Sequence, residues 1–377
     1  MTREGTTFAD EVRGAVTVRA ALLVIGVLAL QMLFIASYVG ALHSPRAKDV
    51  KVAVVAASPK VADQLAAELR KLPGGPLTPR TLADEAAARR QMLNRDIDAA
   101  LVVDSRSAQD TLLVASGQGS TETQLLLRIF GEIERQQQRS LAVDDVAPAS
   151  GSDADGLSSF YLVVGWCVGG YLCAAILAIS AGSRPANGRR AVIRLVVTGL
   201  YAVVSGLLGA VIAGPILGAL PGSVVGLWGL GALTVLAVGA ATLALQAVFG
   251  VVGIGLAILL IVVAGNPSAG GAFPLPLLPD FWRSIGPALP PGAGTWVARS
   301  IAYFHGNAVT GPLLVLSAWA VVGTALTLAM AVLRGKGRGP GRAPDEDTLP
   351  DAPDTPDAPE APNAPEAPGT PGASAAP

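Results

Sequence analysis

Six long apolar segments constrain the fold of this chain more than any other feature. They lie at about residues 19–41, 160–182, 195–217, 224–246, 249–265 and 309–333. A helix needs about 20 apolar residues to cross the roughly 30 Å of hydrocarbon in a bilayer. It also satisfies its own backbone hydrogen bonds there. The spacing predicts a polytopic α-helical membrane protein with one helix, an insert and then five helices.

The first apolar segment resembles a retained anchor more than a cleaved signal peptide. A secretory signal has an apolar core of about 7–15 residues. The run from Ala20 to Val39 is longer, and only Gln31 and Ser37 interrupt it. We therefore expect a short cytoplasmic N-terminus at 1–18 and a first transmembrane helix at 19–42.

Basic residues predict the orientation, because lysine and arginine accumulate on the cytoplasmic side of transmembrane helices. They precede the first segment, separate the second from the third, and follow the sixth: Arg3, Arg13, Arg19, Arg184, Arg189, Arg190, Arg194, Arg334, Lys336, Arg338 and Arg342. The stretch 266–307 carries only Arg283 and Arg299. This pattern places both termini in the cytoplasm and the insert outside the plasma (inner) membrane.

The insert at 43–158 reads as a small α/β domain. Its expected strands are Val50–Ala56, Ile97–Val103 and Thr111–Ala115, and its expected helices are Ala62–Leu72, Leu82–Leu93 and Thr121–Gln138. Alternating strands and helices indicate a partly parallel sheet. The stretch Ser150–Gly156 (SGSDADG) is expected to be a flexible linker back to the membrane.

No catalytic, cofactor or metal site is predicted, so an enzyme is not expected. The insert holds one histidine, His43, and no cysteine. Asp96, Asp98 and Asp104 are interpreted as solvated groups flanking a strand, with a binding surface as the alternative.

The apolar segments contain no ionisable residue away from their ends. Ion-coupled transporters usually need such groups inside the membrane, although sodium sites built from carbonyl groups do not. The chain also lacks the G-x-x-x-x-G-K-[ST] nucleotide-binding pattern. Transport by this chain would therefore need energy from another protein.

In the tail, 336–377, a proline recurs at every third position from Pro350 to Pro371, which is typical of an acidic polyproline II segment without a folded core.

The five helices after the insert, at 159–335, include an unusual loop at 266–308. It is apolar but rich in proline, and it is predicted to form two short helices that lie at, or dip into, the outer leaflet. Five aromatic residues would lie at the membrane boundary and form an outer-leaflet gate: Phe281, Trp282, Trp296, Tyr303 and Phe304. A simple cap over the bundle and a substrate exit are both compatible with this pattern.

The one-plus-five spacing and the sequences NPSAGG (266–271), LLP (277–279) and LPPGA (289–293) resemble the YhgE/Pip (phage infection protein) group of the ABC-type-2 permease superfamily. The likeness covers about residues 15–335. It implies a homo- or heterodimer and, for an exporter, a separate ATP-binding subunit. Coupling to that subunit would fall on Phe8–Val16 and on a loop carrying Arg184, Arg189, Arg190 and Arg194.

The expected function is therefore the membrane (permease) subunit of an ABC-type exporter, in contact with the lipid bilayer and not with nucleic acid. The alternative is a non-transporting envelope scaffold or receptor, such as a phage infection protein-like receptor or a secretion accessory. The sequence does not indicate the substrate.

Overall fold

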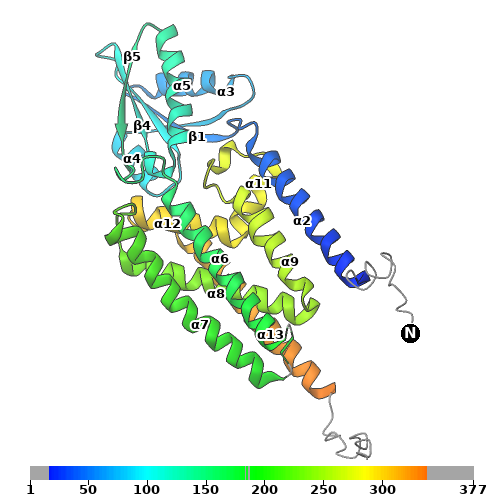
Figure 1. The fold of residues 1–377 in the computed structure, drawn as a ribbon. Helices are drawn as coiled ribbons and strands as arrows, with labels where there is room; N and C mark the ends of the chain where they lie inside the picture. The colour runs from blue at the N-terminus through cyan, green and yellow to red at the C-terminus, as the bar shows by residue number, and fades with distance from the viewer. Residues whose placement is uncertain (1–16, 183, 186, 338–377) are drawn as a thin grey trace, which may run out of the picture. The chain divides into compact units, whose positions relative to one another are not determined.

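The computed structural model describes residues 17–182, 184–185 and 187–337, and these residues are mostly helical (Figure 1). The predicted N-terminal coupling segment Phe8–Val16 and the acidic tail lie outside the described residues. Five described helices are long and apolar enough to cross a membrane. They are α2 (Val18–Leu42), α6 (Ser158–Ala181), α7 (Gly188–Val211), α8 (Val224–Phe249) and α13 (Thr310–Gly337). This mostly helical fold with five candidate spanning helices is consistent with the expected helical membrane protein.

The sixth apolar segment is shorter and broken, so a count of six long helices is not confirmed. It comprises α9 (Val252–Ile258), the π-helix η3 (Leu259–Gly265) and the single turn α10 (Asn266–Ser268). Seventeen helical residues would span only about 26 Å. The π-helix ends two residues before Pro267. A proline has no backbone N–H to donate, and its ring would clash with the carbonyl four residues earlier in a regular α-helix. A second π-helix, η2 (Ile212–Ile216), contains Pro215 at the end of α7.

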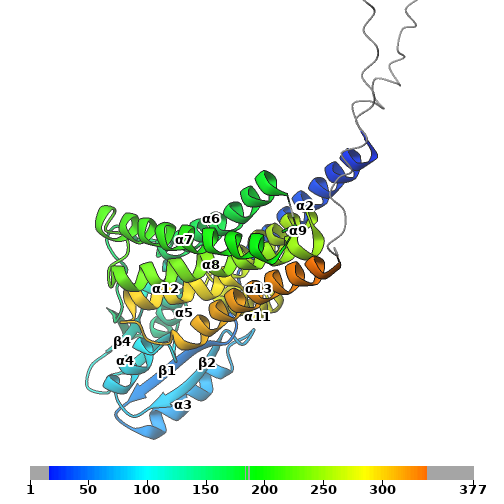
Figure 2. The ribbon, with the colours of Figure 1, turned by 90° about the horizontal axis from the view of Figure 1, so that it is seen from below.

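Helix α8 is the centre of the bundle and contacts α6, α7 and α13. Figure 2 shows α8, the later helix α12 (Pro290–Tyr303) and α13 lying side by side. Glycines allow the close approach. A methyl group on Gly206 of α7 would lie 2.5 Å from the backbone nitrogen of Ala232, and one on Gly323 of α13 would lie 2.6 Å from the backbone of Ala240. Small residues at helix contacts are the usual means of tight packing in membranes.

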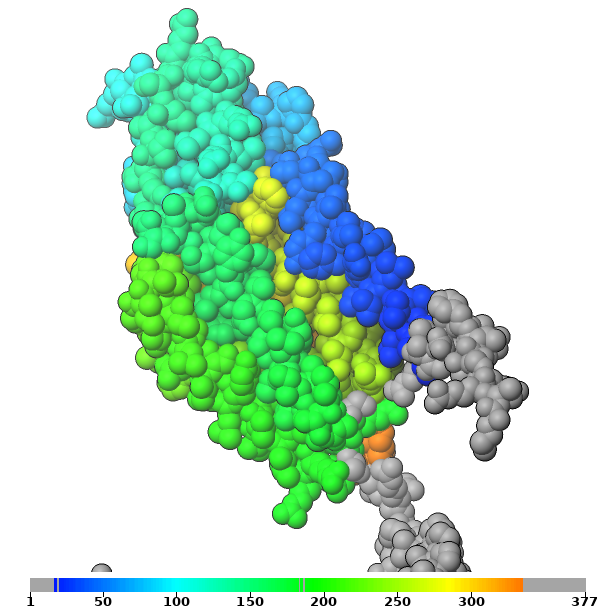
Figure 3. All heavy atoms as spheres, in the orientation of Figure 1, coloured from blue at the N-terminus to red at the C-terminus, as the bar shows by residue number. Residues whose placement is uncertain are grey.

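Helix α2 lies at the edge of the bundle. Its main contacts are with η3 and α10, and Figure 3 shows it lying against the residues of the broken sixth segment. Most of its apolar side chains are exposed, among them Val24 and Ile25. This exposure is suited to contact with lipid.

The insert contains a five-stranded sheet with the order β2-β1-β3-β4-β5. Its strands are β1 (Val50–Ala56), β2 (Leu77–Leu82), β3 (Ala99–Val103), β4 (Gln109–Val114) and β5 (Ser140–Asp145). Strand β1 is parallel to β2 and β3, β3 and β4 are antiparallel, and β4 and β5 are parallel. The helices are α3 (Pro59–Arg70), α4 (Glu85–Leu93) and α5 (Ser120–Gln136). The sheet is thus partly parallel, as expected, but β2 and β5 were not predicted.

The two faces of this sheet have different partners, because side chains alternate along a strand. One face, represented by Val52, packs with Leu69 of α3 and Phe130 of α5. The other face, represented by Ala53, belongs with Met92 of α4 to the same buried cluster as the core of the helical bundle. The sheet domain therefore has one core of its own and shares a second with the helical bundle.

The segment 150–156, predicted to be a flexible linker, is instead a built turn. Asp153 is 5% exposed. Its carboxylate accepts hydrogen bonds from the backbone N–H of Ser158 (2.8 Å) and from the hydroxyl of Tyr303 (2.6 Å). Ser150 donates to the carbonyl of Gly218 (2.9 Å). Buried polar partners that the sequence pattern does not reveal hold this turn in place.

The buried carboxyl of Glu134, at the end of α5, makes a testable contribution to pH-dependent stability. Burial, followed by the nearby Asp110, raises the pKa of Glu134 to about 7, while Arg139 opposes the shift. Because the pKa of Glu134 is higher in the folded than in the unfolded state, the protonated carboxyl contributes to stability. This contribution is fully present below about pH 4.5 and is lost as the pH rises through about 7. We expect Glu134→Gln to leave the melting temperature of the full chain nearly unchanged at pH 5. At pH 8 it should raise the free energy of unfolding by roughly 1–3 kcal/mol.

The measurement is thermal unfolding in detergent at both pH values. Glu132→Gln is the matched control, because Glu132 lies on the same helix with its side chain 55% exposed. Glu132→Gln should change stability equally little at pH 5 and at pH 8. An equal effect of Glu134→Gln at pH 5 and pH 8 would contradict the assignment.

Candidate functional site

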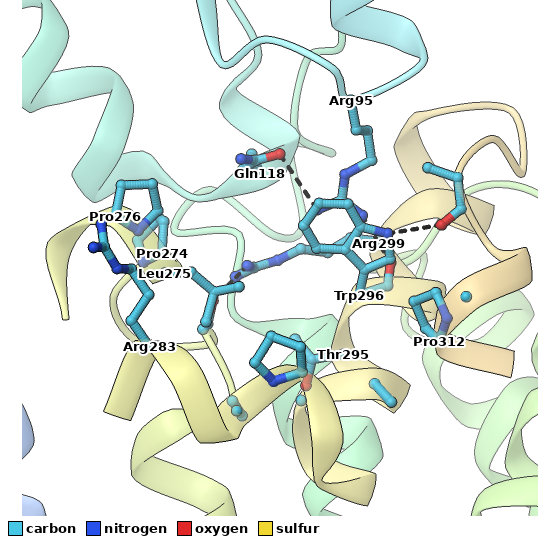
Figure 4. Close-up of a pocket in the computed structure, with 18 of the residues that line it drawn as sticks. Arg95, Gln118, Pro274, Leu275, Pro276, Arg283, Thr295, Trp296, Arg299 and Pro312 are labelled. Atoms are coloured by element: carbon cyan, nitrogen blue, oxygen red, sulfur yellow. Dashed lines mark hydrogen bonds between the residues drawn. The ribbon is translucent and has the colours of Figure 1, made fainter. Parts of the chain in front are cut away.

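A partly open cavity of about 740 Å³ lies between the sheet domain and the segments that follow α10 (Figure 4). The sheet domain contributes Asp49, Lys51, Arg95, Asp98 and Gln118. The helical side contributes residues from 269–299 and from the start of α13, including Ala269, Gly270, Pro274, Leu275, Pro276, Arg283, Ala293, Thr295, Trp296, Arg299 and Pro312.

Arg95 reaches this cavity because helix α4 ends abruptly. Arg95 has a φ of 61°, the left-handed conformation that is uncommon for residues other than glycine. Its N–H donates to the carbonyl of Met92 (2.8 Å), and the N–H of Asp96 donates to that of Gln91 (2.9 Å). These bonds close the last turn of α4 and direct the chain toward β3. The cost of the left-handed backbone is offset by what the Arg95 side chain contacts.

The guanidinium of Arg95 joins the sheet domain to α12. It lies over the ring of Trp296, 3.4 Å from the ring centroid. It donates to the Trp296 carbonyl (2.8 Å), to Oγ of Ser300 (2.8 Å) and to Oε1 of Gln118 (3.3 Å). A cation over an indole face is the favoured arrangement for this kind of contact. Trp296 is itself fixed by a hydrogen bond from its Nε1 to the carbonyl of Ala308 (2.9 Å).

Arg299 lies one turn of α12 beyond Trp296 and is only 3% exposed. Its Nη1 donates to the carbonyl of Gly270 (2.7 Å), and its Nη2 donates to those of Gly271 (2.9 Å) and Gly156 (3.1 Å). These carbonyls belong to the turn after α10 and to the turn before α6. One side chain therefore holds three separate parts of the chain together.

Both guanidinium groups remain charged. Burial lowers the pKa of Arg95 to about 9 and that of Arg299 to about 10. Among the described residues, no carboxylate lies within 4.0 Å of either group, since neither arginine forms a salt bridge. The inner wall of the cavity is therefore positively charged.

The nearby acids weaken this charge only in part. Burial raises the pKa of Asp98, which accepts hydrogen bonds from the backbone N–H of Lys51 (2.8 Å) and from Nε2 of Gln118 (3.3 Å). Burial, followed by the charge of Asp98, raises the pKa of Glu122 to about 8. Asp98 and Glu122 raise the pKa of Arg95, and Glu122 and Asp153 raise that of Arg299, but burial, which lowers both pKa values, is the larger effect.

The five residues of the predicted gate do not come together. Trp296 lines the cavity, and the ring of Phe304 lies 4.8 Å from the guanidinium of Arg95. Tyr303 and Phe304 are buried in the shared core. Phe281 and Trp282 lie on α11 (Asp280–Ile285), edge to face with their centroids 5.1 Å apart, and Phe281 is 63% exposed.

Helix α12, predicted as one of two short helices lying at or dipping into the outer leaflet, is packed against other helices of the chain. Eleven of its residues are buried, and it packs against α6, α8 and α13. Its glycines and alanines fit tightly between helices, although the same residues make it look weakly amphipathic in sequence.

The four arginines predicted to couple to an ATP-binding subunit divide into two pairs. Arg184 donates to the carbonyl of Val248 (3.3 Å) at the end of α8, and Arg194 donates to those of Ala181 (2.8 Å) and Gly182 (2.6 Å) at the end of α6. These two satisfy helix carbonyls that lack partners in the helix itself. Arg189 and Arg190 are exposed in the first turn of α7. Because α7 begins at Gly188, three of the four lie on a helix and not in the predicted loop.

Sequence reasoning missed Arg95 and Gln118 as site residues, and it interpreted Asp98 as a solvated strand-flanking group. Asp96 and Asp104 are indeed exposed, whereas Asp98 lines the cavity. One signal was present, because Arg299 is a single charge in an otherwise apolar stretch. An isolated charge of this kind is rarely buried without partners.

No protein-family model, no curated protein and no solved structure matches this chain. The likeness to YhgE/Pip permeases therefore stays a prediction from the residues quoted above, and function has to be argued from the site.

Proposed function

We propose that this chain is the membrane (permease) subunit of an ABC-type exporter that works as a homo- or heterodimer with a separate ATP-binding subunit. The observation that carries the proposal is the distribution of ionisable groups. In the described apolar helices they lie only near the ends, as with Arg189, Arg190 and Arg194 of α7 and Arg334 of α13. Without an ionisable relay inside the membrane and without a nucleotide-binding pattern, energy has to come from a partner.

The broken sixth segment supports a transport pathway. It ends at α10, and the next residues, Ala269 and Gly270, line the cavity. Discontinuous helices at membrane depth are tolerated where they are covered by protein or line a cavity. In transporters such helices commonly border the substrate path. A substrate leaving the bundle would pass this segment and then the cavity.

The sheet domain would act as a fixed cover over that exit. Arg95 connects it to α12, and α12 packs on three helices of the bundle. A shift of α12 during a transport cycle would therefore be transmitted to the sheet domain. In this proposal the sheet domain lies outside the plasma membrane and both termini lie in the cytoplasm.

The test is co-purification of an ATP-binding subunit in mild detergent, combined with the variant Arg189→Gln/Arg190→Gln. Both side chains are exposed, so the double variant should keep the melting temperature of the full chain within a few degrees. The double variant should lower the stimulation of the partner's ATP hydrolysis by this chain about tenfold or more. The reason is that charged contacts between this chain and the ATP-binding subunit are lost. Arg184 and Arg194 retain the positive charge that orients this end of the bundle.

Arg106→Gln/Arg128→Gln is the matched control, since both residues are exposed in the sheet domain. It should leave ATP hydrolysis unchanged. The absence of any co-purifying ATP-binding subunit, together with no export defect on deletion of the gene, would refute the proposal.

A non-transporting scaffold or receptor is the second candidate, and the shared core favours it as well. A sheet domain packed on the bundle through Ala53, Met92 and Phe304 is a rigid platform for an envelope partner. This candidate predicts that the same purification recovers an envelope protein in place of an ATP-binding subunit. Variants on the exposed face of α5 would then release that protein.

A further inference from the structure

We propose that the cavity between the sheet domain and α12 binds an anionic amphiphile, with an anionic headgroup at Arg95 and Arg299 and an apolar chain along the proline-rich wall. This inference goes beyond the proposed function, because it concerns binding and holds whether or not an ATP-binding subunit exists. It rests on the donors, the charge balance and the apolar lining of the cavity.

The two arginines retain hydrogen-bonding capacity. A guanidinium has five N–H donors. Within the described part of the chain, each of the two makes three hydrogen bonds. The Nε atoms of both are buried and have no hydrogen-bond partner among the residues that the structure describes. Arg299 also lowers the pKa of Arg95, after burial, as expected for two like charges close together. An anion would relieve the repulsion between the two guanidinium groups and accept hydrogen bonds from their remaining donors.

The charge balance of the lining favours an anion. Four basic side chains and two acidic ones line the cavity, which leaves two positive charges when all are ionised. Arg283 pairs with Asp49 at 3.2 Å. Asp98, the other acidic residue, interacts with the charge of Arg95. Arg95, Arg299 and Lys51 therefore face one carboxylate in the lining, and two positive charges remain.

The rest of the lining is apolar. Figure 4 shows Pro274, Leu275 and Pro276 on one side of the arginines and Pro312 on the other. A volume of about 740 Å³ lies within the range of pockets for small ligands. It can take a headgroup and part of one chain, but not a whole two-chain lipid. A ligand that is only an anion would leave this apolar wall unused.

The position of the cavity matches a lipid-like ligand. It lies where α10 ends and where α13 begins, with Pro312 in the first turn of α13. The ends of spanning helices lie at the level of the lipid headgroups. The exposed Phe281 on neighbouring α11 is typical of that level. A headgroup could enter here from the side while its chain stays in apolar surroundings.

The experiment measures binding to the purified full chain in a neutral detergent by native mass spectrometry and by thermal shift. The probes are phosphatidylglycerol, phosphatidylcholine, glycerol phosphate and inorganic phosphate. We expect saturable binding of phosphatidylglycerol that is at least about tenfold tighter than that of phosphatidylcholine, and no saturable binding of the two soluble phosphates. Arg95→Gln should weaken phosphatidylglycerol binding about tenfold.

Gly311→Trp provides a second test that keeps Arg95 intact. A Cβ at Gly311 meets no atom within 4 Å, and this residue lines the cavity, so the indole should fill the cavity and block the lipid without unfolding the chain. Gly131→Trp is the matched control, because Gly131 also has open space around it but lies on α5, away from the cavity. The Gly131→Trp protein should bind phosphatidylglycerol as tightly as the wild type does.

Three results would overturn the proposal. Equal binding of the two phospholipids would exclude an anionic headgroup. Binding of inorganic phosphate as tight as that of phosphatidylglycerol, with the same loss in Arg95→Gln, would show a site for soluble anions and exclude the amphiphile. Unchanged lipid binding in a folded Gly311→Trp protein would place the lipid elsewhere.

Discussion

Replacing Arg299 with leucine is expected to lower the melting temperature of the full chain in detergent by roughly 10 °C. Arg299 is 3% exposed and donates to the carbonyls of Gly156, Gly270 and Gly271. Leucine would leave these buried acceptors without partners, at a cost of about 1–3 kcal/mol for each buried group. For three buried acceptors the loss is about 3 kcal/mol or more in all. That loss corresponds to a shift of several degrees to more than ten for a protein of this size.

Two further variants give this result its meaning. Arg299→Lys keeps the charge but cannot form the same fork of hydrogen bonds, so it should fall between the wild type and Arg299→Leu. Arg128→Leu removes an exposed arginine from α5 and should shift the melting temperature by no more than a degree or two. A similar melting temperature for Arg299→Leu and Arg128→Leu would show that Arg299 does not hold the turns together.

The long helices could be predicted from sequence because their signal is local. Each of α2, α6, α8 and α13 begins or ends within a few residues of the expected bounds. The start of α7 was placed too late, since its first turns carry Arg189, Arg190 and Arg194, and charge was interpreted as loop. The backbone N–H of Arg190 donates to Oδ1 of Asn187 (3.0 Å), and this N-cap marks the true start of α7.

The strands missed by sequence reasoning are the two edges of the sheet. Strand β2 has the sequence LTPRTL and β5 has SLAVDD, and neither shows a run of apolar residues. An edge strand is partly solvated and tolerates proline and charge, so its composition resembles a loop. The central strands β1 and β3 are buried on both faces, and their valine-rich sequences were recognised.

The candidate site could not be predicted because its parts are distant in sequence. Arg95 and Trp296 are brought together only when the sheet domain packs on α12. No local pattern reports such a contact, and the predicted flexible linker at 150–156 argued against it. The aromatic residues of the loop were identified, but their roles differ because α12 inserts into the bundle and α11 does not.

The close contacts between α10, α12 and the segment 269–289 that joins them lead to the second large prediction. A Cβ on Gly286 would lie 1.9 Å from the carbonyl oxygen of Ser268, and one on Gly292 would lie 2.1 Å from that of Gly286. Both clashes are with backbone, which cannot move aside as a flexible side chain would. We expect Gly286→Ala or Gly292→Ala to cost about 3 kcal/mol or more, at or above the upper end of ordinary overpacking. The readouts are the melting temperature and the yield of monodisperse protein after extraction.

Gly255→Ala in α9 separates this clash from the general effect of exchanging glycine for alanine. A Cβ at Gly255 meets no atom within 4 Å. Alanine in a helix interior is favoured over glycine by roughly 0.5–1 kcal/mol, so this variant should be as stable as the wild type or slightly more. The backbone φ of Gly286 is −53°, which alanine adopts freely, so the expected loss at Gly286 comes from space alone. If Gly286→Ala and Gly292→Ala unfold at the same temperature as Gly255→Ala, the segment from α10 to α12 is not packed as the structure has it, and the cavity that it lines would have to be reconsidered.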